Sequence, residues 1–197
     1  AFKLATLLGP TSAAQPITTT PILGIVAGKR VIYIGTGKYL EVADLSTTTV
    51  QTQYAIKDDD ATTTLVNARS ALVQQFLIPN PDGTATRIAG ATATATTPGS
   101  NTVDFSIQRG WFIDFPESRE RVNIDARLVL GTLVVPTIVP SSTECSPGGS
   151  GWLNFFDYRT GGAVNPLTGL TSVKYDSTIV GINVPAFTLS GGNQQKL

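Results

Sequence analysis

Apolar residues in this chain occur in short runs separated by segments rich in glycine, proline and threonine, a spacing typical of strands. The clearest run is Val31–Leu40. Alternate residues from Val31 would face one side of a strand and those from Ile32 the other, and both sets are apolar. We therefore predict a strand buried on both sides, between packed sheets. Its Gly-Thr-Gly end predicts a turn that leads into a polar loop.

The same criteria predict further strands along the chain. They are Phe2–Leu8, Ile22–Val26, Gln51–Lys57, Leu72–Ile78, Gly110–Pro116, Arg127–Thr137, Trp152–Tyr158 and a last strand within Ser177–Thr188. Thr84–Thr97 is almost pure alanine and threonine, so we predict an exposed strand that pairs back on Leu72–Ile78 across a Pro-Asn-Pro-Asp-Gly turn. Leu65 to Phe76 also fits helical spacing, and we favour a short turn followed by the strand.

Two segments, at about 16–58 and 128–158, look alike: each closes on a strand that carries aromatic residues and ends in aspartate. This repeat predicts an all-β fold of four-stranded antiparallel β-propeller blades, with a β-sandwich of short strands as the alternative. We interpret residues 1–197 as a single β domain with a hairpin insertion at about 60–107. A propeller needs roughly four to eight blades, and the chain opens in mid-strand, so we expect a segment of a longer protein.

The amino-acid composition excludes several classes of function. The net charge is zero, and only 14% of residues are charged. Without a basic block, neither nucleic-acid binding nor an electrostatic membrane anchor is expected, and no apolar run reaches the roughly 20 residues of a membrane helix. The chain has no histidine and one cysteine, so it cannot form Ser-His-Asp, Cys-His or two-histidine metal sites by itself. We predict a non-enzymatic protein.

Two glycine-rich turns could be taken for phosphate loops. Gly24–Arg30 has one residue too few between its glycines, and arginine stands where serine or threonine would bind Mg²⁺. Gly35–Lys38 is not followed by a helix pattern that could supply an N-terminal dipole. We interpret the first as a hairpin turn and the second as the end of a strand.

Three consecutive carboxylates, Asp58, Asp59 and Asp60, are the candidate Ca²⁺ ligands. Neighbouring side chains on an extended chain point apart, and neither a D-x-D-x-D spacing nor a closing glutamate is present. The pattern favours a solvated turn, with the cation site as the alternative.

Four acidic residues near a proline turn could offer paired carboxylates to a glycosidase. They are Asp114, Glu117, Glu120 and Asp125. Arg119 and Arg121 lie beside them, so we predict surface ion pairing. Trp111 and Trp152 could stack on sugars, but tryptophan in an apolar strand favours a place in the core.

Four groups of segments, in order along the chain, resemble the C-terminal region of PilC/PilY-type tip-associated adhesins of type IV pili. They are Phe2–Leu7 with Gln15–Thr18; Arg30–Leu40 with Asp44–Leu45 and Gln53–Ile56; Gly110–Pro116 with Glu120–Asn123; and Leu128–Thr132 with Cys145–Gly149 and Phe156–Gly162. The resemblance implies a modified quinoprotein-like β-propeller that is exported to the cell surface, the pilus tip or the outer membrane. It also implies roles in pilus assembly, opposition to retraction, twitching motility, virulence and attachment to host or abiotic surfaces, with minor pilins as partners.

The family's calcium loop, an Asp-rich turn, usually precedes the segment that resembles Phe2–Leu7, and no such loop is found here. The resemblance therefore implies no cofactor in these residues, and any Ca²⁺ site would lie outside them, in the parent protein. For Cys145, a lone cysteine in a surface protein, a disulfide partner elsewhere in the parent is favoured over a free thiol.

Two other functions stay open: a quinoprotein enzyme that binds a quinone and Ca²⁺, and a carbohydrate-binding β domain. For the favoured adhesin and pilus-biogenesis function, three polar loops are the candidate contact surfaces, because binding residues tend to lie on loops held by a rigid scaffold. They are Glu41–Val50, Thr84–Ser100 and Asn165–Asp176.

Overall fold

The computed structural model describes residues 3–58, 64–141 and 149–177. Within these ranges the chain forms ten strands and two short 3₁₀-helices, η1 (Val42–Ser46) and η2 (Ala68–Ala71). The strands are β1 (Ile22–Val26), β2 (Lys29–Gly35), β3 (Thr52–Asp58), β4 (Val73–Pro79), β5 (Thr86–Gly90), β6 (Gly110–Asp114), β7 (Arg127–Val129), β8 (Thr132–Pro140), β9 (Gly149–Asp157) and β10 (Leu170–Tyr175). None of the helices in the described ranges is long and apolar enough to cross a membrane.

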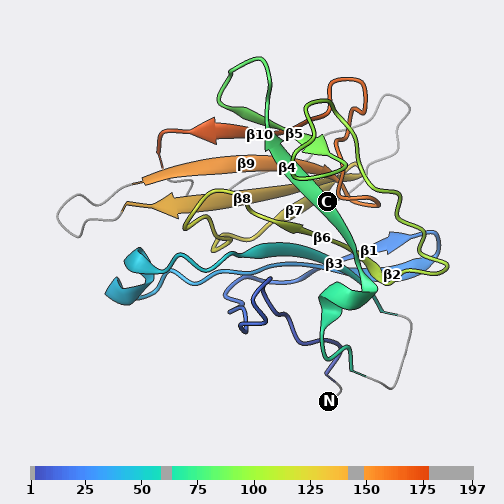
Figure 1. Cartoon of the computed structure of the whole chain (residues 1–197). Coiled ribbons are helices and arrows are strands. Elements are labelled where there is room, and N and C mark those ends of the chain that lie inside the picture. Colours follow the sequence, from blue (N-terminus) through green and yellow to red (C-terminus); the bar gives the residue numbers. More distant parts are fainter. Residues whose placement is uncertain (1–2, 59–63, 142–148, 178–197) are drawn as a thin grey trace, which may run out of the picture.

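The strands form two antiparallel units of four, which we call the first blade (β1-β2-β3-β6) and the second blade (β7-β8-β9-β10). The β4–β5 hairpin joins them, because β4 pairs parallel to β6 and β5 pairs antiparallel to β10. The blades lie one above the other in Figure 1. The all-β prediction with four-stranded antiparallel blades is confirmed.

The main core lies between the blades and is rich in aromatic residues. The ring of Trp111 on β6 lies 6.3 Å from that of Tyr33 on β2 and 6.3 Å from that of Phe156 on β9, measured between centroids. All three side chains are almost fully buried. The predicted core position of Trp111 is therefore confirmed, and large aromatic side chains from both blades hold the blades together.

A second, smaller core covers the outer face of the first blade. There Ile34, Tyr54 and Phe112 pack with Leu7 and with residues around Leu72. The strand β2 is thus buried on both faces, as predicted. Its outer cover is irregular, however, because the predicted strand Phe2–Leu8 forms only isolated bridges in its described part, at residues 5 and 8.

Two tight hairpins mark the starts of the blades. Ala27 and Gly28 have positive φ angles of 49° and 74°, the conformation of a two-residue turn whose twist matches its strands. The interpretation of this segment as a hairpin turn is confirmed. A single strand over Arg127–Thr137 is wrong: Leu130 and Gly131, with φ angles of 46° and 81°, form a second such turn between β7 and β8.

Two predictions of which residues form strands and which form loops are also wrong. Within Thr84–Thr97 only β5 is a strand, and it is buried because it lies between β4 and β10. The pairing of β5 with β4 is as predicted. Asn165–Asp176 is predicted as a loop but contains β10, and the predicted strand within Ser177–Thr188 lies almost entirely outside the described residues.

Candidate functional site

The three predicted contact loops differ in the structure. Asn165–Asp176 and Thr84–Ser100 each supply an interior strand of the sheet. Glu41–Val50 contains only the short helix η1 and lies between β2 and β3. In Figure 1 it extends beyond the strand ends, so we examine it as the candidate contact surface and name residues 38–47 the 38–47 loop.

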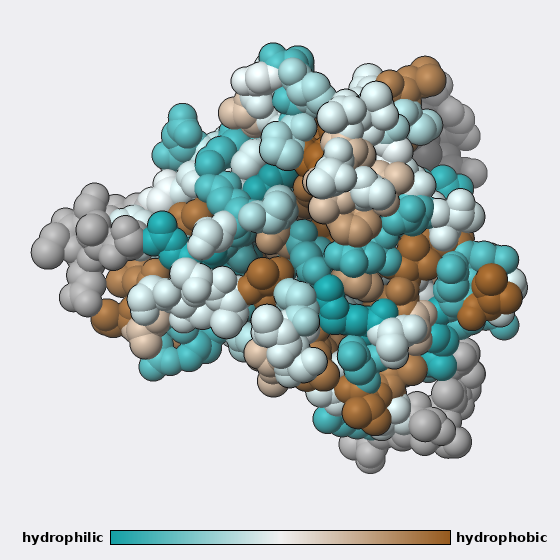
Figure 2. Space-filling model, viewed as in Figure 1, coloured by the Kyte–Doolittle hydropathy of each residue, from teal (hydrophilic) through white to brown (hydrophobic). Residues whose placement is uncertain are grey.

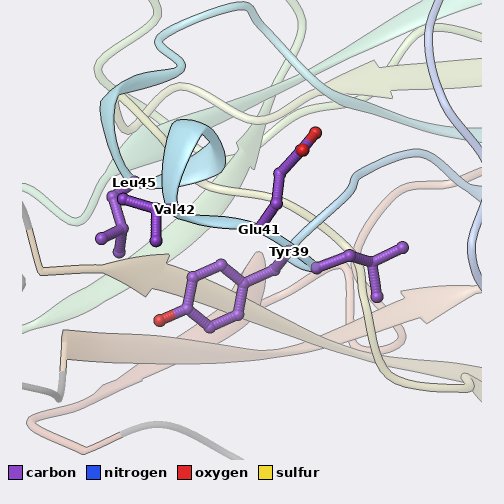
Figure 3. Close-up of a pocket in the computed structure, with 5 residues that line it drawn as sticks. Tyr39, Glu41, Val42 and Leu45 are labelled. Carbon is purple, nitrogen blue, oxygen red and sulfur yellow. The ribbon is translucent and has the colours of Figure 1, made fainter.

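The 38–47 loop exposes apolar side chains around a hollow of about 340 Å³. Tyr39, Leu40, Val42 and Leu45 line it together with Glu41. Figure 3 shows the Tyr39 ring, Val42 and Leu45 on one side of the loop and the Glu41 carboxylate directed away from them. Leu40 is 77% exposed and Val42 62% exposed. Figure 2 shows that apolar residues form separate patches on the visible face, and clustered exposed apolar residues are typical of contact sites.

The loop is fixed from inside by the guanidinium group of Arg121. Its Nη1 atom donates to the carbonyl oxygens of Lys38 at 2.8 Å and Asp44 at 2.9 Å, and Nη2 donates to that of Thr47 at 2.8 Å. Nε donates to the carbonyl of Arg119 at 2.9 Å, within the same segment. Because Arg121 is only 3% exposed, these bonds are shielded from water and hold both ends of the loop in place.

Asp44 fixes the turn from the other side. Its Oδ2 atom accepts hydrogen bonds from the backbone N–H groups of Leu40 at 2.8 Å and Glu41 at 3.1 Å, and Lys38 Nζ lies 3.3 Å from Oδ1. Burial acts to raise the pKa of Asp44, but these donors outweigh it and hold the pKa below its ordinary value. The carboxylate is thus ionised at neutral pH and keeps η1 folded.

The Gly-Thr-Gly sequence at the end of β2 makes room for the segment that carries Arg121. A Cβ atom on Gly35 would lie 2.6 Å from the Val122 side chain, and one on Gly37 would lie 2.5 Å from the Val122 carbonyl oxygen. The Val122 N–H donates to the carbonyl of Thr36 at 3.0 Å. The interpretation as a strand end holds, and the glycines are needed for close backbone packing.

Glu120, the neighbour of Arg121, points into the second blade. Its carboxylate accepts two bonds from Arg87, at 3.0 and 2.8 Å, and one from Thr137 at 2.7 Å. Burial raises the pKa of Glu120 against the lowering effect of these partners. The predicted surface pairing is wrong for Glu120, which is buried because β5 brings Arg87 to it.

An indole ring completes this charged cluster. The Arg87 guanidinium lies 3.6 Å from the centroid of the Trp152 ring. Trp152 Nε1 donates to Glu117 at 2.6 Å, and Lys174 Nζ donates to the same carboxylate at 2.8 Å. Burial opposes ionisation of Glu117, but these two donors hold its pKa below the usual range. Trp152 is therefore a buried structural residue, and with Trp111 in the core neither indole is open to a sugar.

The remaining acidic candidates are also paired. Asp114 accepts from both terminal nitrogens of Arg69 at 2.7 and 2.6 Å, and Asp125 accepts from the backbone N–H of Thr20 at 2.8 Å. Asp114 and Asp125 thus hold separate elements in place and do not form a pair of catalytic carboxylates.

The residues of the metal and disulfide predictions lie at or beyond the ends of the described ranges. Asp58 lies at the end of β3 and forms an ion pair with Arg30, while Asp59, Asp60 and Cys145 lie outside the described residues. In the part of the chain that the structure describes, no three residues of the types histidine, cysteine, aspartate or glutamate gather to hold a metal ion. The calcium and disulfide hypotheses stay predictions.

Comparison with known proteins gives the family. A family model described as the PilY1 β-propeller domain matches residues 4–115. The type IV pilus biogenesis factor PilY1 of Pseudomonas aeruginosa strain PAO1 is 31% identical over 169 residues, 76% of this chain. The chain belongs to the PilY1 family. The resemblance to PilC/PilY-type proteins is thereby confirmed.

Two further PilY1 relatives agree. The PilY1 homolog of Xylella fastidiosa is 28% identical over 193 residues, 92% of this chain. The crystal structure of the P. aeruginosa PilY1 C-terminal domain superposes with a TM-score of 0.62 at 26% identity, covering 80% of this chain and 34% of that one. The chain spans only 14% of P. aeruginosa PilY1 and 12% of the X. fastidiosa protein.

The sequence predicts a polar loop over Glu41–Val50 but not its apolar surface. Leu40 was assigned to the preceding strand, and Val42 and Leu45, two apolar residues within the predicted loop, were the available signal. Arg121 was not predicted as the anchor. No local pattern could show this, because the three loop carbonyls that Arg121 binds lie 83, 77 and 74 residues away in sequence.

Proposed function

We propose that this chain is a non-enzymatic propeller segment of a type IV pilus biogenesis factor and that it binds a protein partner through the 38–47 loop. Membership of the PilY1 family supports the pilus role, since the named relatives are type IV pilus biogenesis factors. The observation that carries the contact role is the exposed apolar hollow on a loop fixed by Arg121.

A fixed apolar loop is suited to binding because little conformational entropy is lost on association. Immobilising a flexible side chain or loop at an interface lowers affinity by roughly 0.5–1.5 kcal/mol for each side chain. Here Arg121 and Asp44 already hold the backbone, so Tyr39, Leu40 and Val42 are presented in place. Tyrosine is one of the residues enriched among the few that dominate the energy of protein interfaces, and Tyr39 is the aromatic residue in this hollow.

The specific roles are part of the proposal. We assign the partner to the minor pilins and the location to the cell surface or pilus tip, where the protein would support assembly, twitching motility and attachment to surfaces. The apolar character of the hollow supports a protein partner over a polar glycan, and both tryptophan rings are buried away from solvent.

The test is a double substitution, Leu40→Ser with Val42→Ser, in the full-length protein of a piliated bacterium. Both side chains are exposed, so the fold should be retained. We expect fewer surface pili, smaller twitching zones and weaker binding of the purified protein to one minor pilin. Leu167→Ser, at a position that is 91% exposed on another loop, is the matched control. Normal piliation and unchanged binding to every minor pilin would contradict the proposal.

A further inference from the structure

The strand β1 is an edge strand that runs beside β2, and the hairpin turn between them lies at the end of β2 away from the 38–47 loop. It pairs with β2 on one side only, in a register that places Val26 opposite Lys29 and Leu23 opposite Ile32. The nearby strand β7 approaches its inner face, where a Cβ atom on Gly24 would lie 3.1 Å from Leu128, but β7 forms no ladder with β1. The backbone edge of β1 that faces away from β2 therefore has no strand paired with it within the described part of the chain.

The register shows which backbone groups face the open side. Residues that flank a two-residue hairpin turn exchange both hydrogen bonds, and along the ladder bonded and non-bonded pairs alternate. Val26, Gly24 and Ile22 thus bond to β2, while the N–H and C=O groups of Leu23 and Ile25 point away from it. These backbone groups can accept another strand.

The same two residues expose apolar side chains. Leu23 is 72% exposed and Ile25 59% exposed, on the outer face of the first blade. The strand contains no lysine, proline or bulge, the features by which proteins commonly protect an edge from pairing. Open backbone groups and exposed aliphatic side chains coincide at the same two positions.

A hollow of about 600 Å³ lies where β1 ends. Its lining includes the apolar residues Val26, Val103 and Phe105, and among its polar residues is Asp104, whose Oδ1 accepts a hydrogen bond from the Ser106 N–H. Lys29 also lines it, and this exposed ammonium has no ion-pair partner among the described residues. Arg159 at the rim is already paired with Asp157 at 2.7 Å. A partner that follows β1 to its end would therefore meet the Lys29 ammonium, which forms no ion pair in the described ranges, beside Val26, Val103 and Phe105.

We propose that β1 binds an extended segment of a different protein by strand addition. Apolar residues at alternating positions of that segment contact Leu23 and Ile25, and a carboxylate at one end lies in the hollow near Lys29. Main-chain hydrogen bonds supply affinity in this mode, and the alternating side chains and the charge supply specificity. The site is distinct from the 38–47 loop and does not depend on the function proposed for that loop.

The test uses two fluorescein-labelled octapeptides in which valine alternates with threonine, with aspartate as either the first or the last residue, so that both strand directions are covered. Binding to the chain is measured by fluorescence anisotropy. Ile25→Pro removes an N–H that points to the open side and leaves the bonds to β2 intact. We expect it to weaken binding about tenfold or more, while Leu167→Ser, far from β1 in sequence, has no effect.

A charge exchange keeps the test decisive if Ile25→Pro fails to fold. Lys29→Glu should weaken binding of the aspartate peptide and restore binding of a peptide with lysine at that position. Binding that is equal in wild type, Ile25→Pro and Lys29→Glu would overturn the proposal, as would no binding at about 1 mM peptide. Self-association of the chain that Ile25→Pro abolishes would show a second copy as the occupant and would also overturn it.

Discussion

Glu120 and Arg121 are neighbours in sequence but serve two different regions of the molecule. Glu120 points toward the second blade, where it accepts from Thr137 on β8 and meets the opposite charge of Arg87 on the neighbouring strand β5. Arg121 points toward the first blade and donates its hydrogen bonds to carbonyl oxygens, three of them on the 38–47 loop, while the Asp44 carboxylate acts on it only electrostatically. The backbone between them is held by both blades, since Arg121 exchanges two hydrogen bonds with Ile138 on β8 and Val122 donates to Thr36.

This difference in partners determines how each buried charge contributes to stability. A buried ion pair stabilises only while both partners are present, because the remaining charge is otherwise desolvated without compensation. The hydrogen bonds of the Arg121 guanidinium go to carbonyl dipoles, and the carboxylate that acts on it electrostatically, Asp44, has donors of its own. Three of those carbonyls belong to a surface loop that water can reach once it opens. We therefore expect global effects at Glu120 and local effects at Arg121.

The largest effect is expected for Glu120→Gln, which removes the charge and keeps the size of the side chain. Arg87 would stay buried without its main counter-charge, so the free energy of unfolding should fall by about 3 kcal/mol or more. Urea denaturation followed by tryptophan fluorescence measures it, since Trp152 stacks on Arg87.

Glu117→Gln is the matched control for that substitution. Its carboxylate is partly exposed and lies 3.5 Å from Arg87. We expect a loss of about 1 kcal/mol, typical of a single partly exposed hydrogen-bonded group. Equal losses for Glu117→Gln and Glu120→Gln would contradict the assignment of Glu120 as the main partner of Arg87.

The next effect is expected for Arg121→Ala. The loss of its hydrogen bonds to the loop should lower the free energy of unfolding by about 2 kcal/mol, and hydrogen exchange should increase mainly within residues 38–47. Hydrogen exchange measured by mass spectrometry separates this local opening from a global loss. Increased exchange spread evenly over both blades would show that Arg121 acts on the whole fold.

The comparison also shows what sequence can predict. The apolar run of β2 and the turn at Ala27 and Gly28 were predictable because hydrophobic period and glycine placement are local signals. The strand β10 was not, because its buried residues are polar: Thr171 Oγ1 donates to the Arg87 carbonyl at 3.1 Å, and Ser172 Oγ donates to Asn154 at 2.7 Å. Such residues are satisfied only in the folded chain, so a hydrophobic pattern does not show them.

The same limit applies to the candidate site. The position of the 38–47 loop followed from the end of an apolar run. The sequence also shows that Leu40 and Val42 are apolar, and the structure shows that both are exposed. The anchors were not, since an arginine that binds distant carbonyls looks like any surface arginine in sequence. Local pattern thus located the loop, and only long-range packing showed that it is rigid.

Acid should loosen the 38–47 loop by protonating Asp44. The pKa of Asp44 is held below its ordinary value of 3.8, so the stability it supplies is present above that pH and is lost as pH falls through the folded value. We expect the amide NMR signal of Leu40, which donates to Asp44, to shift in that range. Asp44→Asn should abolish the shift, and a shift that persists in this variant would assign the titration to another group.

The smallest effect is expected for Lys38→Ala. Lys38 forms an exposed ion pair with Glu41, and its other partner Asp44, which is buried, keeps two backbone N–H donors without it, so the melting temperature should change little. The substitution should still raise the pKa of Asp44 toward its ordinary value, because Lys38 is one of the donors that lower it. The Leu40 signal would then titrate at higher pH than in the wild-type chain, and adding salt to the wild-type chain should produce part of the same change. An unchanged titration would mean that the N–H groups of Leu40 and Glu41 alone hold the carboxylate, and that the loop is fixed by Arg121 and its own backbone.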